Sequence, residues 1–317
     1  MDRIDRYDIH HRIGGGAMGE LLLATERLAD GTLAPVAIKR ILPEAASDPK
    51  LVKMLIDEGR VTRGLAHPGI ARTLRTVEQD KQFYLVMEFV DGTDVKSLIR
   101  KLREMGKRLP AALGAFVAMR AADALDFAHR ATSEDGTWLQ IVHRDINPTN
   151  LMISYAGEVR VIDFGIARAA DRLTATRAGV VKGKLRYMAP EQASGTQLDQ
   201  RTDIYALGLV LYELLSGTRP LSNLSDMEFI HVALRGELPR LRDLKIGLPD
   251  ELDAIVARAT MREQDDRYTW GSEMATDLEN WLLTLPKQPS EAELGGVMRR
   301  LFPQEAERMP QFLASLG

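Results

Sequence analysis

The chain has 317 residues, of which 45% are hydrophobic, enough apolar surface to bury a core in one large domain or two smaller ones. Its net charge of −3 comes from mixed charges, which excludes a globally basic surface for nucleic acid or an anionic membrane. The sequence has no cysteine, which excludes disulfides and cysteine metal sites and fits a reducing cytosol. We therefore predict a cytoplasmic protein with no nucleic-acid partner.

Two stretches bear on secretion and membranes. The opening "MDRIDRYDIHHRI" is charged and has no apolar segment, so it does not have the pattern of a secretory signal. The most apolar later run, "YALGLVLYELL" at 205–215, is shorter than the roughly 20 residues that span a bilayer. We predict no membrane segment in this chain; a membrane anchor or a further domain beyond residue 317 stays open.

Strand patterns fill the first part of the chain. Alternating apolar residues between Gly-rich and Asp-Gly turns predict five strands. These strands cover 9–13, 19–28, 33–42, 69–79 and 83–90. Apolar residues at helical spacing predict one helix at about 50–64. We expect a small β-rich unit with one main helix over residues 1–88.

Helical patterns dominate from residue 89 to about 284, beginning with "VKSLIRKLREM" and "ALGAFVAMRAADALDFAHRA". Residues 285–317 then form a linker, "LPKQPS", and a short helical extension, although Gly295 and Gly296 weaken its helix. The apolar face of that extension consists of Leu294, Val297, Met298, Leu301 and Phe302. The whole pattern predicts an α+β fold with a β-rich first part and a larger, mostly helical second part.

The first motif is a glycine-rich turn. Gly14, Gly16 and Gly19 in "IGGGAMGELL" have the spacing G-x-G-x-x-G, and glycine lets a backbone turn sharply and approach phosphates closely. A plain hairpin turn is the alternative. A dinucleotide-binding unit would continue into a helix, whereas a strand follows here. The pattern favours a hairpin lid over a nucleotide.

The second motif, "VAIK", places Lys39 at the end of an apolar strand. A lysine in a half-buried strand needs a partner for its ammonium group, and Glu58 on the predicted helix is the candidate. The alternative is an ordinary surface lysine, and the later motifs favour the pair.

Oxygen-bearing side chains follow in the helical part. Asp145 and Asn150 lie in "HRDINPTN", and Asp163 lies in "VIDFG" after a strand. Mg²⁺ prefers one or two such ligands together with phosphate oxygens and water. "YMAPE" at 187–191 and a buried helix that starts near Asp203 come next. Asp163 alone could be a turn aspartate, but all these motifs in this order are not expected by chance.

This set of motifs resembles that of eukaryotic-type protein kinases, in particular the Ser/Thr kinases of bacteria. The resemblance covers roughly residues 7–284. It implies a two-lobed kinase fold with an N-lobe at 1–88, a hinge and C-lobe at 89–284, and ATP between the lobes. It also implies Mg²⁺ or Mn²⁺ as the metal, protein substrates that bear Ser or Thr, and self-association for autophosphorylation.

The resemblance also implies the residues of the ATP site. Met87 would be the gatekeeper of the adenine pocket, and the backbone of Glu88 and Val90 would bind adenine. Asp94 matches the acidic ribose contact. The full site comprises Ile13, Gly14, Gly16, Gly19, Leu21, Ala37, Lys39, Met87, Glu88, Val90 and Asp94.

The catalytic roles come from the same resemblance. Lys39 would bind the α- and β-phosphates while paired with Glu58. Asp145 would orient and deprotonate the acceptor hydroxyl, and Asn150 and Asp163 would hold Mg²⁺. Phosphoryl transfer needs in-line positioning and charge neutralisation rather than covalent help, so these few groups suffice.

Two further relationships are implied. Glu191 should pair with Arg267, which lies in "DDRYT". Arg144, next to the catalytic aspartate, should bind a phosphate on the activation loop, where Thr174 and Thr176 are candidate phosphorylation sites. Two ordinary loop threonines are the alternative.

Two departures from the family pattern concern charge near the transferred phosphate. Asn147 stands where the Ser/Thr family has a lysine that neutralises the transferring phosphoryl group. Lys184 stands where the family has a threonine that packs against the catalytic aspartate and that lysine. We predict that Lys184 supplies the displaced cation. Lys182 and Arg186 are nearby alternatives, and a surface role for Lys184 is the simplest one.

A third departure is the long link before the "HRD" motif, in which "EDGTW" predicts a hairpin tip. It lengthens a surface turn and leaves the site unchanged.

Three functions then compete. A Ser/Thr protein kinase is favoured by Pro148 and by the absence of an arginine at position 149. A pseudokinase or nucleotide-binding scaffold is supported by Asn147 and opposed by the complete set of other catalytic residues. A small-molecule phosphotransferase is opposed by "YMAPE" and the helix that follows it.

Overall fold

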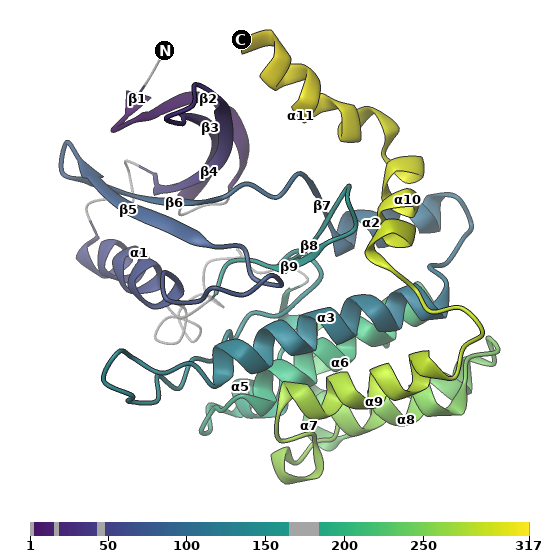
Figure 1. Cartoon of the computed structure of the whole chain (residues 1–317). Coiled ribbons are helices and arrows are strands. Elements are labelled where there is room, and N and C mark those ends of the chain that lie inside the picture. Colours follow the sequence, from purple (N-terminus) through teal and green to yellow (C-terminus); the bar gives the residue numbers. More distant parts are fainter. Residues whose placement is uncertain (1–2, 16–18, 43–47, 165–183, 317) are drawn as a thin grey trace.

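The computed structural model describes residues 3–15, 19–42, 48–164 and 184–316, and of Lys50, Met54 and Lys184 it describes the backbone alone. Figure 1 shows two lobes: a curled sheet with a helix beside it, and a bundle of helices. An extended hinge after β6 joins them. This is the two-lobed α+β fold predicted from the sequence.

The N-lobe sheet is antiparallel, with six described strands in the order β1-β2-β3-β4-β6-β5. The strands are β1 (Arg3–Ile4), β2 (Tyr7–Gly15), β3 (Gly19–Arg27), β4 (Leu33–Ile41), β5 (Thr73–Gln79) and β6 (Gln82–Glu88). Side chains alternate between the two faces along each strand, and one face buries a core of apolar residues. That core includes Leu22, Ala24, Val36, Ile38 and Val86.

Two strand boundaries differ from the prediction. β5 begins at Thr73 rather than at residue 69, because Ile70 forms an isolated parallel bridge to Val161 in the other lobe. β6 ends at Glu88 rather than at residue 90, and the chain then continues as the hinge. An apolar run does not show where sheet pairing stops, so the sequence could not locate these ends.

Helix α1 (Pro49–Thr62) packs against β4, β5 and β6. Gly59 permits a close approach, because a Cβ at this position would lie 2.6 Å from Oγ1 of Thr76 and 2.7 Å from Cδ1 of Leu85. This contact fixes the helical turn that carries Glu58.

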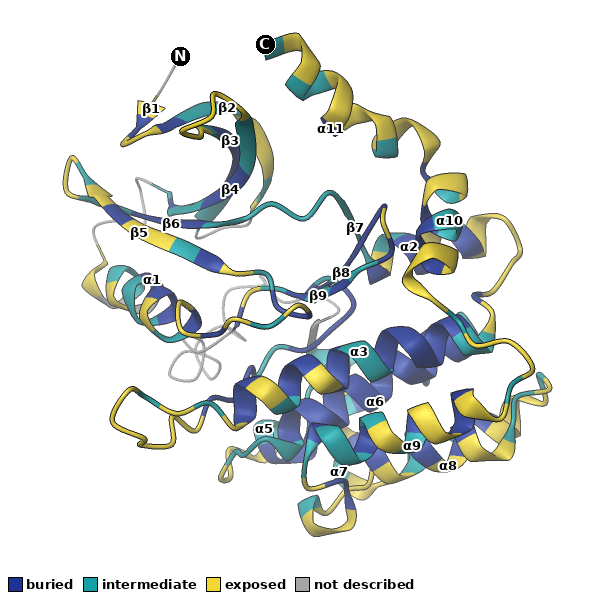
Figure 2. Cartoon of the chain, in the orientation of Figure 1, coloured by how far each residue is buried: buried dark blue, intermediate teal, exposed yellow. Residues whose placement is uncertain are grey.

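The C-lobe is a helical bundle with a small sheet on the side of the hinge. Its helices are α2 (Val95–Glu104), α3 (Ala111–His129), α5 (Pro190–Ser194), α6 (Arg201–Ser216), α7 (Asp226–Arg235), α8 (Asp250–Ala259) and α9 (Gly271–Leu283). The strands are β7 (Gly92–Asp94), β8 (Leu151–Ser154) and β9 (Val159–Val161). Helix α6 is buried on almost every side, and α3 is buried over most of its surface (Figure 2), as their largely apolar sequences require.

The hairpin predicted from "EDGTW" is present. Thr132 and Trp138 form an antiparallel bridge, and the N–H of Ser133 donates to the carbonyl of Thr137 at 2.8 Å. Along the described ranges, no helix is both long enough and apolar enough to cross a membrane.

The C-terminal extension forms two helices, α10 (Glu291–Leu301) and α11 (Pro303–Leu316). Gly295 was expected to weaken α10, but the helix runs through it. A Cβ at Gly295 would lie 2.5 Å from the carbonyl oxygen of Ala156, so glycine allows α10 to lie directly on the β8–β9 turn. The glycine therefore serves packing at a cost in helix propensity.

The predicted pair of Glu191 and Arg267 is confirmed. The two terminal guanidinium nitrogens of Arg267 donate to the two carboxylate oxygens of Glu191 at 2.7 and 2.9 Å, and both residues are buried. Three backbone carbonyls also accept from Arg267, so its donors are well satisfied. The pair joins α5 to the segment between α8 and α9.

We expect Arg267→Ala to lower the free energy of unfolding by about 3–5 kcal/mol, because the carboxylate of Glu191 would stay buried without its cation. Urea denaturation followed by circular dichroism measures this change. Arg235→Ala is the matched control, since Arg235 is 57% exposed and pairs with Glu237 at the surface, a contact that contributes about 1 kcal/mol or less. Equal losses in the two variants would contradict the prediction.

Candidate active site

The "HRD" segment is held by α6. Asp203, in the first turn of α6, accepts hydrogen bonds from the N–H groups of His143 and Arg144, both at 2.7 Å. It also lies 2.8 Å from Nε2 of His129. Burial alone would raise the pKa of Asp203, but the hydrogen bonds from His129 and from the backbone N–H of His143 outweigh burial and lower it. The carboxylate thus fixes the backbone next to Asp145.

From the sequence, Asp203 was predictable only as the start of a buried helix. A carboxylate at the first turn of an otherwise apolar, buried helix was the available signal, because such a charge must have partners. Those partners lie about 60 residues earlier in the chain, so spacing alone could not identify them.

His143 orients the neighbouring side chains. Its Nε2 lies 3.0 Å from the carbonyl oxygen of Ile162, and its Nδ1 accepts from the N–H of Asp145 at 3.3 Å. Because Nδ1 accepts this bond and Nε2 faces a carbonyl oxygen, the ring carries its proton on Nε2, and burial lowers the pKa of His143. The ring also packs on Phe164, with centroids 4.7 Å apart. His143 thereby links the "HRD" and "DFG" segments.

Two asparagines brace Asp145. The side-chain amides of Asn147 and Asn150 each donate to the backbone carbonyl of Asp145 at 2.7 Å. Asn150 donates further to Oδ2 of Asp145 at 3.1 Å. The amide oxygen of Asn147 accepts from the N–H and the hydroxyl of Thr149 at 2.9 and 2.5 Å. Asn147 is 2% exposed, and its side-chain amide forms these hydrogen bonds within the loop.

Lys39 connects the two lobes. Its Nζ donates to the two oxygens of Glu58 at 2.8 and 3.0 Å and to Oδ1 of Asp163 at 3.2 Å. Burial would lower the pKa of Lys39, but the carboxylates of Asp163 and Glu58 raise it above its ordinary value. The lysine is therefore a fixed cation, and α1 is turned inward so that Glu58 reaches it.

The predicted metal ligands lie on adjacent segments. The carbonyl of Asn150 accepts from the N–H of Ile162 at 3.0 Å, which places Asn150 next to the residue before Asp163. Asp163 has a left-handed backbone, with φ 55°, and its side chain is 43% exposed. Within the described ranges, no three His, Cys, Asp or Glu side chains are grouped to hold a metal. One carboxylate and one amide oxygen nonetheless fit Mg²⁺ or Mn²⁺ that is also bound by phosphate oxygens.

Backbone geometry requires glycine at two described positions of the glycine-rich turn. The backbone of Gly15 has φ 139°, and a Cβ there would lie 2.7 Å from Cα of Glu20. A Cβ at Gly19 would lie 2.8 Å from the carbonyl of Arg40. At Gly14 a Cβ would meet only ordinary contacts. The turn therefore requires glycine at 15 and 19, and Gly16 lies outside the described residues.

Sheet register gathers the predicted adenine-side residues. Leu21 pairs with Lys39, and Ala37 pairs with Met87 across neighbouring strands. Because alternate residues share a face, these four side chains lie on one face of the sheet, opposite the core that contains Ile38. Ile13 lies on β2 before the turn and is 39% exposed.

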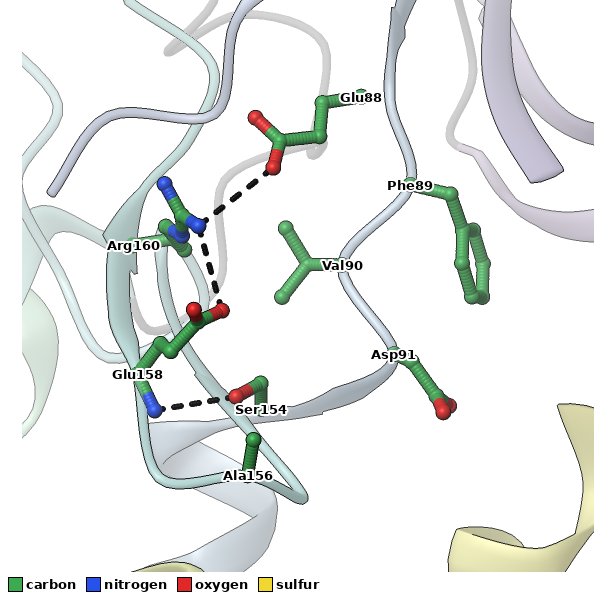
Figure 3. Close-up of a pocket in the computed structure, with 8 residues that line it drawn as sticks. All are labelled: Glu88, Phe89, Val90, Asp91, Ser154, Ala156, Glu158 and Arg160. Carbon is green, nitrogen blue, oxygen red and sulfur yellow. Dashed lines mark hydrogen bonds and ion pairs between the residues drawn. The ribbon is translucent and has the colours of Figure 1, made fainter. Parts of the chain in front are cut away.

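The hinge is held from behind. The N–H of Glu88 donates to the carbonyl of Arg72 at 2.9 Å. Figure 3 shows a pocket of about 220 Å³ between residues 88–91 of the hinge and the β8–β9 turn, which we call the rear pocket. In it Arg160 contacts Glu88 at 3.5 Å and Glu158 at 3.2 Å. Val90, predicted to bind adenine through its backbone, also lines this pocket.

Asp94 has a structural role that the sequence analysis did not predict. Its Oδ1 accepts from the N–H of Ser97 at 2.6 Å and caps the start of α2. The sequence "DVKS" contains the signal, since aspartate is a preferred N-cap. Helix capping fixes Asp94 at the end of the hinge, where the predicted ribose contact would be made.

Several predictions lie outside the described residues: Gly16, Thr174, Thr176, Lys182 and the side chain of Lys184. Arg186, the described alternative to Lys184, is bound elsewhere. It is 7% exposed, donates to Asp226 at 2.8 Å, and donates to the carbonyls of Leu221 and Leu224. Arg186 is therefore a structural residue and not the displaced cation.

A curled antiparallel sheet, a helical second lobe, and a lysine that contacts both the sheet-side glutamate and the second-lobe aspartate define the protein-kinase class of folds. The chain belongs to the protein kinase domain family, whose model matches residues 7–289.

Similar proteins are bacterial kinases. The chain is 40% identical over 299 residues to "Tyrosine-protein kinase MasK" of Myxococcus xanthus, which covers 94% of this chain and 46% of that protein. It is 33% identical over 274 residues to "Serine/threonine-protein kinase PrkC" of Bacillus subtilis, and this match covers 86% of this chain and 40% of that protein. This chain spans less than half the length of these two curated relatives.

Among solved structures, the PknI kinase domain of Mycobacterium tuberculosis is similar, with a TM-score of 0.65 and 26% identity. The match covers 88% of this chain and 97% of that one.

Proposed function

We propose that this chain is an active protein kinase that transfers the γ-phosphate of ATP to Ser or Thr hydroxyls of proteins, itself included. The contact of Lys39 with Glu58 and Asp163 is the observation that carries the proposal. It joins the sheet, α1 and the proposed metal-binding segment in one arrangement. A protein that does not transfer phosphate has no chemical need to keep Lys39, Glu58 and Asp163 together.

Bound ATP with Mg²⁺ supplies the phosphoryl group and the metal charge that neutralises it. In this proposal Lys39 orients the α- and β-phosphates, and Asn150 and Asp163 hold the metal. Asp145 orients the acceptor hydroxyl and accepts its proton, with its backbone fixed by Asn147 and Asn150. The remaining ATP contacts are those predicted from the sequence.

Lys184 is proposed to supply the cation that Asn147 cannot. The amide of Asn147 is buried within the loop and carries no charge, and Arg186 is bound away from the site. The backbone of Lys184 begins a short 3₁₀ helix, Lys184–Tyr187, whose last residue is the first residue of "YMAPE".

The acceptor residue is the finer part of the proposal. One relative is named a tyrosine kinase, whereas others, PrkC and "Serine/threonine-protein kinase PknB" of Mycobacterium leprae, are named Ser/Thr kinases. Pro148 and the absence of an arginine at position 149 follow the Ser/Thr pattern, so we propose Ser/Thr acceptors.

We expect the purified chain, incubated with γ-labelled Mg-ATP and a mixed protein acceptor, to yield labelled phosphoserine and phosphothreonine after acid hydrolysis. Acceptor analysis by two-dimensional separation measures this result, and a reaction with EDTA is the control. Label found mainly in phosphotyrosine would contradict the proposed Ser/Thr specificity and show that the kinase phosphorylates tyrosine. Absence of label with tight ATP binding would favour the pseudokinase.

The pseudokinase remains the second candidate because Asn147 removes a charge that the family places near the phosphate. Its polar atoms are all used within the catalytic loop, so Asn147 cannot take over that role by itself. Intact Lys39, Glu58, Asp145 and Asp163 oppose this candidate.

Regulation through the activation loop is a further part of the proposal. Thr174 and Thr176 would be autophosphorylated by a second copy, and Arg144 would bind the phosphate. The backbone of Arg144 is held on both sides, by Asp203 and by Gln192, whose Nε2 donates to its carbonyl at 3.0 Å. We place the kinase in the cytoplasm, where ATP and protein acceptors are available.

A further inference from the structure

The C-terminal helix α11 reaches back to the N-lobe. The ring of Phe312 meets the ring of His10 edge to face, with centroids 4.9 Å apart, and that of His11 at 5.9 Å. Figure 1 shows α11 rising beside β2, and Figure 2 shows that most of its remaining surface is exposed. Both histidines lie on β2, the strand that leads into the glycine-rich turn.

The other end of the extension is anchored in the C-lobe. Leu294 and Met298 of α10 are fully buried in the main core. Gly157 has φ 100°, and a Cβ there would lie 1.8 Å from the carbonyl of Glu291, so the β8–β9 turn and α10 are in direct backbone contact. The guanidinium of Arg299 donates to the carbonyl of Tyr155 in the same turn.

That turn also holds the hinge. The N–H of Tyr155 donates to the carbonyl of Asp91 at 2.9 Å, and Figure 3 shows Asp91 and Ala156 on the two walls of the rear pocket. Burial and the carboxylates of Glu305 and Asp91 raise the pKa of Tyr155 to about 12, so its hydroxyl stays neutral. The extension therefore starts behind the hinge and ends on the strand before the glycine-rich turn.

We propose that α10 and α11 form a strap between the lobes, and that Phe312 is a positioning residue that acts through β2 on the turn covering the nucleotide. The proposal rests on the proposed kinase function. Lobes joined by a hinge open and close about it, and a contact that spans both lobes favours the arrangement in which it forms. Phe312 contacts His10 and His11 on β2, outside the predicted ATP site, so its effect should reach nucleotide binding through that strand.

We expect Phe312→Ala to raise the KM for ATP about threefold to tenfold and to leave kcat within about twofold, as loss of one aromatic contact implies. Phe312→Tyr keeps the ring and should restore the parent value. Leu283→Ala is the matched control, because Leu283 is 57% exposed at the end of α9. A KM unchanged in Phe312→Ala, with the parent active, would overturn the strap.

A second measurement does not depend on activity. The chain has no cysteine, so Leu28→Cys in the N-lobe and Met227→Cys on α7, both at exposed positions, take spin labels at defined sites. Electron–electron resonance on the full chain should show a wider distance distribution after Phe312→Ala than in the labelled parent. An identical distribution would overturn the strap. A parent without phosphate transfer would overturn the proposed function, and the label distances would still decide the strap.

Discussion

Asp145→Asn should reduce phosphate transfer by about 10²–10⁴-fold and leave ATP affinity within about twofold, because the proton of the acceptor hydroxyl loses its base. The substitution keeps the size of the side chain. The backbone carbonyl that Asn147 and Asn150 brace is also unchanged. The loop should therefore keep its conformation, so the loss would report the carboxylate itself.

Labelled transfer at saturating ATP, together with ATP affinity from calorimetry, measures this result. Asp265→Asn is the matched control, since the carboxylate of Asp265 is 94% exposed on the far helical lobe. Parent-like transfer by Asp145→Asn would remove Asp145 from the mechanism. A loss of ATP binding in parallel with transfer would instead indicate a disturbed site.

Lys184→Ala should reduce transfer by about 10²–10³-fold with ATP still bound, the loss that follows removal of one charge-stabilising group from an active site. The reason is the missing charge at Asn147, which leaves the transferring phosphoryl group without its usual cation. The same assay and calorimetry measure the effect. Lys287→Ala is the control, because Lys287 is 80% exposed and pairs with Glu293 at the surface, at 3.1 Å.

Asn147→Lys in the Lys184→Ala background tests whether the cation was displaced. We expect it to recover part of the lost transfer but less than the parent rate, since the lysine cannot replace the bonds of Asn147 to Asp145 and Thr149. A Lys184→Ala variant that transfers phosphate normally would show that this lysine is an ordinary loop residue.

Much of the fold could be predicted from sequence because the motifs are local. Strand alternation, the helix that carries Glu58, and the "HRD" and "DFG" segments each occupy a short stretch. The partner of Lys39 was also predictable, since a half-buried ammonium group requires a carboxylate. The Arg267 pair was predicted from the family order of motifs, and the structure shows it in full.

Contacts between distant segments were not predictable in the same way. Asp203 binds a loop about 60 residues earlier, and Phe312 meets β2 about 300 residues earlier. Asn147 was treated as a lost charge, because its hydrogen bonds to the loop depend on a backbone turn that composition does not reveal. The requirement for glycine at 15 likewise comes from a backbone angle.

Because the "HRD" backbone is attached to Asp203, the predicted catalytic residues fall into two groups, one fixed to the C-lobe and one carried by the N-lobe. Asp145 and Asn150 are fixed to α6 in the middle of the helical bundle, whereas Lys39 and Glu58 belong to the sheet and α1. Under the proposed function, a movement of the N-lobe relative to the C-lobe would shift the bound nucleotide, whereas Asp145 would stay fixed to α6. Substitutions in the sheet should alter mainly nucleotide capture, and substitutions around α6 should alter mainly turnover.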